Sequence, residues 1–392
     1  MLAALIERRL CVGNAVVVVN LISIPVRGIV ETCRRHLSNF SLNCAFHILG
    51  LSMRSEMNPY SWMYFLLIAI ACSLACADTF KAPTDIDFTG FRSAIRSALH
   101  NSNQTDTIKP LTAVSTYLDC HLPNSAIILT LANFYAVEQL ALQHKALEVW
   151  NLKECLESRF VSVCLDEKCM EVCTANSIRN CYLLAIETTA SEFMQNAFRF
   201  LMYLKHLLMY EALKEVQEVF FIDVDVLLFR NPFVGMLYGR KEDGSRDLNG
   251  EKPDMMWQGE FGYSSGCAGR PNGGQLYLRR TAKLSKYFET LFSLRESFLG
   301  KGQNDQDKLL EITSAANLTT CTLPFTRFTA HTMKTNAPFD KSVPVAEIVS
   351  YHTSGISGRE NKVMAMGHML KGVINAKSGN ESAESLFAYD WL

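Results

Sequence analysis

The feature that most constrains the fold of this chain is a run of apolar residues that ends in two carboxylates. Val219–Ile222 is apolar throughout, and Asp223 and Asp225 follow it. Continuous hydrophobicity without alternation is typical of a central, parallel strand that is covered on both faces. Burying an unpaired carboxylate costs several kcal/mol, so such groups are normally paired, hydrogen-bonded or bound to a metal. The stretch therefore predicts a covered sheet with a polar site at the end of one strand.

Strands and helices alternate on both sides of this run. Besides Val219–Ile222, we predict strands at Ile127–Leu129, Arg159–Asp166, Pro253–Gln258, Gln275–Arg280 and just before His352, and helices at Tyr135–Trp150, Ser191–Lys214, Thr281–Leu294 and from about Asn361. The alternation predicts an α/β fold with a sheet flanked by helices.

The two aspartates lie where α/β proteins bind ligands, at the carboxyl end of a central strand. With the strand period of two, Asp223 and Asp225 share a side unless the chain is already turning. Two oxygen ligands are too few to hold an ion alone. They suit Mg²⁺ or Mn²⁺ that completes its octahedron with phosphate oxygens and water. Capping or turn chemistry is the alternative for such a short pattern.

The N-terminal region contains a second strongly apolar run, Trp62–Ala77, which ends in the small-x-small pattern of a signal-peptidase site. It is shorter than the roughly 20 residues that a spanning helix needs. We predict a signal peptide over 57–77, and a short membrane anchor through 62–77 is the alternative. Residues 1–56 fit poorly in front of such a segment, and we treat them as a leader outside the fold.

The remaining chain reads most simply as one domain. Residues 78–123 show no strong period and are expected to form a stem or irregular lead-in. The catalytic domain is expected over 124–375, with a tail at 376–392. A net charge of −1 argues against a large basic surface, and therefore against a nucleic-acid partner.

Cysteine usage favours an oxidising compartment. The chain has 13 cysteines, and five of them lie close together between Cys155 and Cys181. No CxxC pair occurs there and no histidine is interleaved, so disulfides are favoured over a zinc site, with their pairing left open. Sequons at Asn103, Asn317 and Asn380 fit the same compartment. Together with the apolar segment, these features predict the secretory pathway, most simply the Golgi lumen.

Four segments, in order, resemble motifs of the nucleotide-diphospho-sugar transferase family. The resemblance implies a GT-A-like fold, with a mixed, mostly parallel sheet flanked by helices in a Rossmann-like nucleotide-sugar domain. Tyr203–Phe233 resembles the lysine-bearing helix, central strand, DxD motif and Asn-Pro exit of that family. Asn272–Arg280 resembles its Asn-Ser/Thr-Gly strand, Asn304–Ile312 its Asp-Gln helix start, and Tyr351–Lys362 its closing His…Gly…Lys segment. The resemblance spans roughly Ser125 to Gly367.

The resemblance implies a set of metal and phosphate ligands. Asp225 would bind a divalent ion directly, Asp223 would contact the ion or the ribose, and His352 would be the third protein ligand. Lys362 would neutralise the diphosphate as it leaves the anomeric carbon. The alternatives are a hydrogen-bonded loop histidine for His352 and a solvated lysine for Lys362.

A second set of residues is implied for the donor sugar. Lys205 would reach toward the nucleotide-sugar, or else extend along the protein surface into water. Asn272, Gly273 and Gly274 would let the backbone pass close to the sugar, or form a plain turn. Gly273 stands where the family has Ser or Thr, so a hydroxyl contact is absent and the donor is not predicted.

Three further residues are candidates for catalysis. Asp305 and Gln306 would hold acceptor or donor hydroxyls, with helix capping as the alternative. Gln258 is our candidate for the β-face of the donor sugar. No carboxylate stands out as the base of an inverting attack, although Glu260 and Asp307 are candidates, and the resemblance implies retention of anomeric configuration.

The sequence therefore predicts a glycosyltransferase that depends on Mn²⁺ or Mg²⁺. It would move a sugar from a nucleotide-diphospho-sugar donor to a glycan or glycoprotein acceptor. One alternative is a non-catalytic, luminal glycan-binding protein of the same fold. The other is a phosphatase similar to the haloacid dehalogenases, whose Asp-x-Asp motif also follows an apolar strand. That motif should open the catalytic domain, and here it falls in mid-domain.

Overall fold

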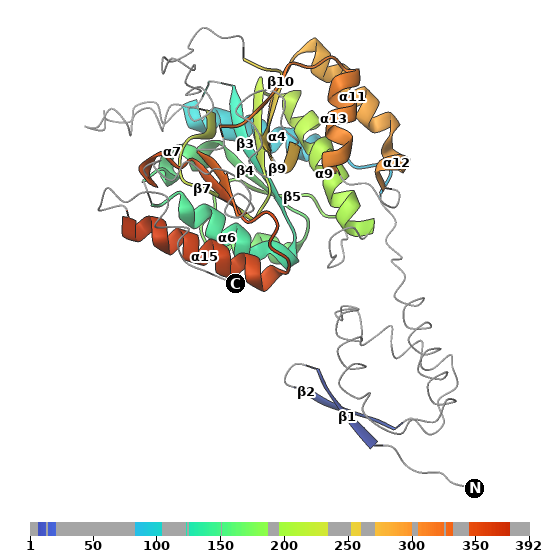
Figure 1. The fold of residues 1–392 in the computed structure, drawn as a ribbon, viewed down its shortest axis with the longest axis vertical. Helices are drawn as coiled ribbons and strands as arrows, with labels where there is room; N and C mark the ends of the chain where they lie inside the picture. The colour runs from blue at the N-terminus through green and yellow to red at the C-terminus, as the bar shows by residue number, and fades with distance from the viewer. Residues whose placement is uncertain are drawn as a thin grey trace. The chain divides into compact units, whose positions relative to one another are not determined.

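The computed structural model describes two units of the chain, Met1–Lys81 and Ala82–Leu392 (Figure 1). The described residues are 7–12, 15–20, 83–103, 123, 125–149, 151–186, 196–233, 252–259, 271–299, 305–324, 327–331 and 345–376. In the first unit, β1 (Glu7–Val12) and β2 (Ala15–Asn20) form an antiparallel hairpin. The expected signal segment lies outside the described residues, as does the tail beyond Ala376.

The second unit is built on a seven-stranded sheet with the order β10-β8-β9-β6-β3-β4-β5. These strands are β3 (Ala126–Ala132), β4 (Phe160–Cys164), β5 (Cys181–Leu183), β6 (Glu218–Ile222), β8 (Met255–Gly259), β9 (Pro271–Arg279) and β10 (Thr320–Thr322). In this sheet β9 is antiparallel to its neighbours β6 and β8, and the other pairs are parallel. The predicted mixed, mostly parallel sheet is confirmed.

A smaller sheet of three strands lies beside the first, in the order β11-β12-β7. Its strands are β11 (Phe328–Ala330), β12 (Ser350–His352) and β7 (Val226–Leu228). β12 is parallel to β11 and antiparallel to β7. Since β6 belongs to the large sheet and β7 to the small one, the chain crosses between the sheets within Asp223–Asp225.

One hydrophobic core joins the two sheets at this crossing. All five residues of β6 are buried, which explains why Val219–Ile222 is apolar without alternation after Glu218. Phe220 of β6 packs against Phe233 and against Phe328 of β11, with ring centroids 6.1 Å and 5.9 Å apart. Large aromatic side chains shared between the sheets hold the crossing rigidly, because a close-packed core resists small displacements.

Helices cover this framework in two groups. α6 (Val137–Ala146) and α15 (Arg359–Ala376) lie side by side and pack on β7, whereas α9 (Asn196–Leu213), α11 (Ala282–Ser293), α12 (Arg295–Leu299) and α13 (Asp305–Ala315) gather away from them (Figure 1). Shorter elements are η1 (Phe134–Ala136), α7 (Lys153–Leu156), η2 (Glu157–Arg159), α8 (Glu167–Ala175) and η4 (Val345–Glu347). The helix expected over Tyr135–Trp150 is shorter than predicted, because η1 precedes it. Within the described ranges, no helix combines the length and the apolarity that crossing a membrane requires.

The structure corrects one expectation, the stem or irregular lead-in over 78–123. α4 (Thr89–Asn103) is a regular helix in this segment. Its Phe91 and Ile95 are fully buried, and the ring of Phe91 lies 5.9 Å from that of Tyr182 on β5. Apolar side chains one helical turn apart bury this face against the sheet. The compact domain therefore includes α4.

Two disulfides staple the edge of the large sheet. Cys164 at the end of β4 bonds Cys169 of α8, and Cys173 of α8 bonds Cys181 of β5. They hold α8 against the edge strands and supply the pairing that the sequence left open. The prediction of disulfides is confirmed for these four cysteines.

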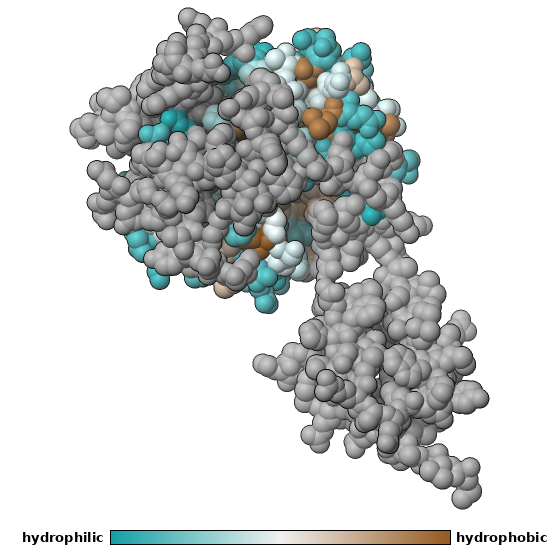
Figure 2. Space-filling model, in the orientation of Figure 1, coloured by the Kyte–Doolittle hydropathy of each residue, from teal (hydrophilic) through white to brown (hydrophobic). Residues whose placement is uncertain are grey.

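The surface that the structure describes carries few large apolar side chains. On the face in Figure 2, hydrophobic residues over α11 to α13 form small patches between hydrophilic ones. The large hydrophobic side chains found exposed in the described part are Tyr135, Leu310, Met364 and Ile374. Isolated exposures of this kind are ordinary for a protein surface.

Candidate active site

The two aspartates lie in a turn that links the sheets. The backbone N–H of Asp223 donates to the carbonyl of Gly274 at 2.8 Å, and that of Val226 donates to the carbonyl of Asp223 at 3.1 Å. The buried amide of Gln143 on α6 donates to the carbonyls of Asp223 and Val226, both at 3.0 Å. The chain is thus already turning here, and these hydrogen bonds fix where the carboxylates point.

Three predicted metal ligands come together at this turn. One ligand atom from each of Asp223, Asp225 and His352 lies within 4.8 Å of the other two. Asp223 is the outer member, with 28% of its side chain exposed, whereas Asp225 and His352 are buried. His352 ends β12, which pairs with β7 directly after the turn, so strand pairing brings the imidazole to the aspartates. Two carboxylates and an imidazole suit Mn²⁺ or Mg²⁺.

Asp225 is surrounded by groups that favour its charged form. Its Oδ2 accepts hydrogen bonds from the Lys362 ammonium at 2.6 Å and from the Thr353 hydroxyl at 3.0 Å. Burial alone would raise the pKa of Asp225, but the charge of Lys362 and the neighbouring imidazole of His352 outweigh it and hold the pKa well below its usual range. Asp225 is therefore a carboxylate at neutral pH. The ammonium of Lys362 places a positive charge beside this expected metal ligand.

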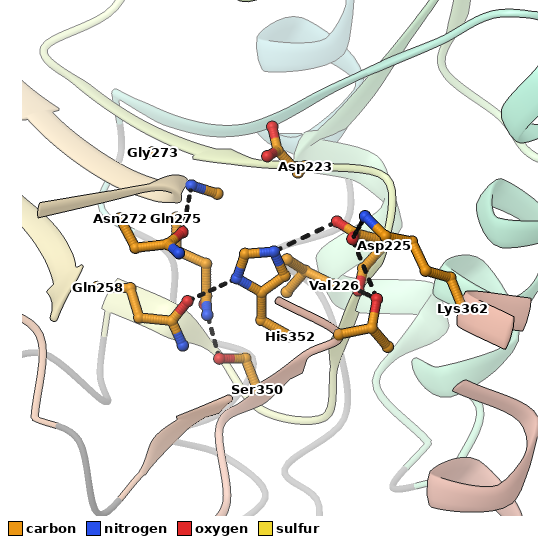
Figure 3. Close-up of polar contacts among 12 residues, drawn as sticks. Asp223, Asp225, Val226, Gln258, Asn272, Gly273, Gln275, Ser350, His352 and Lys362 are labelled. Carbon is orange, nitrogen blue, oxygen red and sulfur yellow. Dashed lines mark hydrogen bonds and ion pairs between the residues drawn. The ribbon is translucent and has the colours of Figure 1, made fainter. Parts of the chain in front are cut away.

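The hydrogen bonds of His352 leave one ring nitrogen facing Asp225. Its Nδ1 lies 2.7 Å from Oε1 of Gln258, and its Nε2 lies 3.4 Å from Oδ1 of Asp225 (Figure 3). Because the amide oxygen of Gln258 can only accept, Nδ1 carries the proton. In the neutral ring, the Nε2 lone pair then faces a carboxylate. Two acceptors that face each other favour a cation between them.

Gln258 itself lies elsewhere than expected. It is 1% exposed, and its amide nitrogen donates to the carbonyls of Phe328 and Thr329 at 3.2 Å and 3.0 Å. With its oxygen engaged by His352, the side chain is directed into the interior. The expected role at the β-face of a donor sugar does not fit this placement, and Gln258 is instead a neighbour of a candidate metal ligand.

Gly274 lies against the imidazole. A Cβ atom at Gly274 would come within 2.2 Å of Cε1 of His352, closer than real Cβ atoms approach other atoms. The Asn272 side chain accepts a hydrogen bond from the Gly274 N–H at 2.9 Å, which shapes the start of β9. Glycine is therefore required here by close approach to His352, whereas we had expected close approach to the donor sugar.

Lys205 is buried, which excludes the surface alternative. It is 1% exposed, and its ammonium donates to the carbonyl of Gly273 at 3.0 Å. The same nitrogen lies 3.9 Å from Oδ1 of Asp223 and 5.9 Å from the ring centroid of Phe221. A buried cation between the glycine loop and the outer aspartate links two of the predicted donor-site segments.

Lys362 extends from the first turns of α15 to the site. Nearby Asp225 raises the pKa of Lys362, against an opposing effect of burial, so the lysine is charged. It keeps 31% of its side chain exposed. Its partner in this structure is Asp225, and its role beside a diphosphate stays a prediction.

The other two predicted catalytic residues open α13. The Gln306 amide donates to the carbonyl of Pro271 at 3.1 Å and so ties α13 to the first residue of β9. Asp305 is the first residue of α13, and its side chain lies outside the described atoms, as do Glu260 and the side chain of Asp307. The role of Gln306 in binding acceptor or donor hydroxyls stays a prediction.

Sequence reasoning missed two residues of the site. Gln143 holds the turn from α6, and Thr353 binds Asp225 through its hydroxyl. Thr353 directly follows His352, so its place in the matching segment was a usable clue. Gln143 lies 80 residues before Asp223, and nothing in the local sequence distinguishes it from a surface glutamine.

The fold and the site define an α/β protein with a carboxylate–imidazole cluster at the carboxyl end of a central strand. Residues 155–366, more than half of the chain, match the family model for nucleotide-diphospho-sugar transferases. The chain belongs to that family and is a glycosyltransferase. A sequence search of curated proteins finds no match. Membership of this family argues against the phosphatase alternative.

Several solved structures are distantly similar. A glycosyltransferase involved in the glycosylation of the major capsid of PBCV-1 has 13% identity and a TM-score of 0.37, with 62% of this chain and 98% of that chain covered. Mouse xyloside xylosyltransferase 1 has 13% identity and a TM-score of 0.35, with 59% of this chain and 99% of that chain covered. The glycosyltransferase GlyE of Streptococcus pneumoniae has 11% identity and a TM-score of 0.36, with 64% of this chain and 62% of that chain covered. The family assignment rests on the family model alone.

Proposed function

We propose that this glycosyltransferase depends on a divalent cation, Mn²⁺ or Mg²⁺, held by Asp223, Asp225 and His352. The observation that carries the proposal is the 3.4 Å contact between Asp225 Oδ1 and His352 Nε2, the ring nitrogen that faces the carboxylate while Nδ1 is engaged by Gln258. The Lys362 ammonium already compensates the other oxygen of Asp225. The cluster is thus built for positive charge, and a bound ion would supply neutralisation of the diphosphate oxygens.

The residues of the chain itself have three roles in this proposal. Asp225 and His352 bind the cation from the interior, and the half-exposed Asp223 contacts the cation or the ribose from the solvent side. Lys362 donates to the phosphate oxygens, where negative charge develops as the sugar leaves. Lys205 holds the Gly273 backbone beside the donor sugar through its hydrogen bond.

The acceptor in this proposal is a glycan or a glycoprotein, and transfer retains the anomeric configuration, as the family resemblance implies. We place the reaction in the secretory pathway, in the Golgi lumen. Two disulfides support this, since disulfides persist in oxidising compartments. The exposed sequon residue Asn317 fits the same location.

A thermal-shift experiment tests the metal proposal. A ligand that binds only the folded state raises its Tm by mass action. We expect a nucleoside diphosphate such as UDP or GDP to raise the Tm when Mn²⁺ is present, and to have no effect in EDTA. A shift that is equal with and without metal would contradict the proposed cation site.

The same samples separate catalysis from binding. A transferase releases nucleoside diphosphate from its sugar nucleotide, slowly to water and faster with an acceptor, and coupled detection of UDP or GDP follows this release. Metal-dependent binding without any release, across a panel of sugar nucleotides and glycan acceptors, would favour the non-catalytic glycan-binding alternative.

A further inference from the structure

Gln258 connects three strands at the back of the candidate metal site. It lies on β8 of the large sheet, and its amide nitrogen donates to the carbonyls of Phe328 and Thr329 on β11 of the small sheet. Its amide oxygen lies 2.7 Å from Nδ1 of His352 on β12. The side chain is buried, so water does not compete for these hydrogen bonds.

These contacts determine the orientation of the amide. A backbone carbonyl can only accept a hydrogen bond, so the amide atom that faces Phe328 and Thr329 must be the NH₂ group. The oxygen of Gln258 therefore faces His352 and can only accept. The proton of the neutral imidazole is consequently held on Nδ1, and the lone pair on Nε2, which faces Asp225.

The imidazole ring of His352 packs closely against the backbone of Gly274. Its Nδ1–Cε1–Nε2 edge lies over Gly274, where an added Cβ would be 2.9 Å from Nδ1, 2.2 Å from Cε1 and 2.8 Å from Nε2. Gln258 is at one end of this edge and Asp225 is at the other (Figure 3). A histidine whose remote nitrogen is fixed by a hydrogen bond offers its other nitrogen as a stronger and better directed ligand.

We propose that Gln258 is a positioning residue that holds His352 in the Nδ1–H tautomer and so presents Nε2 to the divalent cation. The metal part of this inference rests on the proposed function, whereas the tautomer part is a property of the metal-free protein. Gln258 would act through His352 and contact neither the cation nor the donor.

Imidazole ¹⁵N–¹H NMR of the metal-free protein reads the tautomer directly. The measurement is made at about pH 8, well above the ordinary histidine pKa of about 6.5. We expect wild-type His352 to carry its proton on Nδ1. In Gln258→Met, which keeps the length of the side chain but lacks the amide oxygen, we expect the proton on Nε2, where it can donate to Asp225.

Mn²⁺ affinity, measured by titration calorimetry, is the second readout. We expect Gln258→Met to weaken binding about 10- to 100-fold, the usual effect of losing such a partner. Gln275→Met is the matched control. Gln275 is a buried glutamine on β9 that accepts from Ser350, two residues before His352, so its loss tests general damage to the site.

The outcomes separate the two parts of the inference. An Nε2–H tautomer in the wild type, or an unchanged tautomer in Gln258→Met, would overturn the role of Gln258. Equal loss of Mn²⁺ affinity in Gln258→Met and Gln275→Met would overturn it too, because the effect would then be unspecific. If His352 of the wild type carries its proton on Nδ1 but the protein binds no Mn²⁺, the metal proposal would be wrong and the tautomer assignment would still hold.

Discussion

Two buried histidines of this protein each lie between a carboxylate and a neutral polar side chain, and they make an instructive pair. Nε2 of His144 lies 2.9 Å from the hydroxyl of Ser162, and its Nδ1 lies 3.6 Å from Oε1 of Glu157. All three side chains are buried, and the imidazole stacks on Phe160 with centroids 4.6 Å apart. The cluster has the residue types of a catalytic triad, but it is enclosed in the core.

The difference between the clusters lies in what the neutral partner can do. The hydroxyl of Ser162 is able to donate to Nε2 of His144, and in that tautomer the Nδ1 proton is directed toward Glu157. Gln258 can only accept from His352, which leaves a lone pair directed toward Asp225. The first cluster can therefore direct a proton toward its carboxylate, whereas the second directs a lone pair toward its carboxylate. Residue types alone therefore do not mark a binding site, because the order of donors and acceptors decides.

The largest expected effect comes from neutralising the carboxylate in each cluster. Asp225→Asn removes a proposed metal ligand and the charge that attracts the cation, so we expect Mn²⁺ affinity and sugar transfer to fall by at least about 100-fold. Glu157→Gln, the matched change in the other cluster, should leave both unchanged and lower the free energy of unfolding by about 1–3 kcal/mol. Calorimetric titration with Mn²⁺ and urea unfolding measure the two effects.

The same two substitutions can also contradict the distinction between the two clusters. If Glu157→Gln lowers Mn²⁺ affinity as much as Asp225→Asn does, the clusters are not functionally distinct. The comparison would also fail if a folded Asp225→Asn protein transferred sugar at a near-normal rate.

A second prediction concerns the room around the imidazole of His352. Gly274→Ala would place a methyl group 2.2 Å from Cε1 of the ring, so the ring must move away from Asp225. We expect Mn²⁺ affinity to fall about 10- to 100-fold. Gly367→Ala on α15 is the control, since its Cβ would have no neighbour within 4 Å and alanine favours a helix by about 1 kcal/mol. Unchanged Mn²⁺ affinity in Gly274→Ala would show that the packing does not position the ring.

Much of this site was predictable because its chemistry is concentrated in short segments. The apolar run before Asp223 predicted a buried strand. The order of the matching segments predicted that His352 and Lys362 belong to the same site. Those predictions depend on a long apolar run and on short segments that resemble the family, and both can be read from the sequence. The crossing between two sheets was not predicted, because β7 is only three residues long and continues the apolar run of β6.

The roles of Gln258 and Lys205 needed coordinates, because they depend on long-range packing. Gln258 meets His352 across 94 positions of sequence, and its donors and acceptors are assigned only when the carbonyls of β11 are in place. Lys205 stands on an apolar helix face, and sequence alone leaves a buried and an exposed lysine equally plausible. The cluster of His144 was invisible for the same reason, since its three members lie on α6, η2 and β4.

The smallest expected effect distinguishes the clusters by their response to acid. Burial lowers the pKa of His144, and Glu157 opposes this only in part. The unfolded chain therefore binds a proton near the ordinary histidine pKa of about 6.5, while the folded protein does not bind it until lower pH. Folding stability from this residue is complete above about pH 6.5 and is lost as the pH falls below it, by at most about 1.4 kcal/mol per pH unit.

His144→Gln isolates that contribution, because glutamine keeps a donor and an acceptor but does not titrate. We expect its free energy of unfolding, measured with urea from about pH 7.5 to 5.5, to fall less steeply toward acid than that of the wild type. Its Mn²⁺ affinity at neutral pH should match the wild type, since no hydrogen bond of His144 reaches Asp225 or His352 in the described part of the chain. Equal slopes for both proteins would mean that His144 is protonated as readily in the core as in water, and that its enclosure does not set it apart from His352.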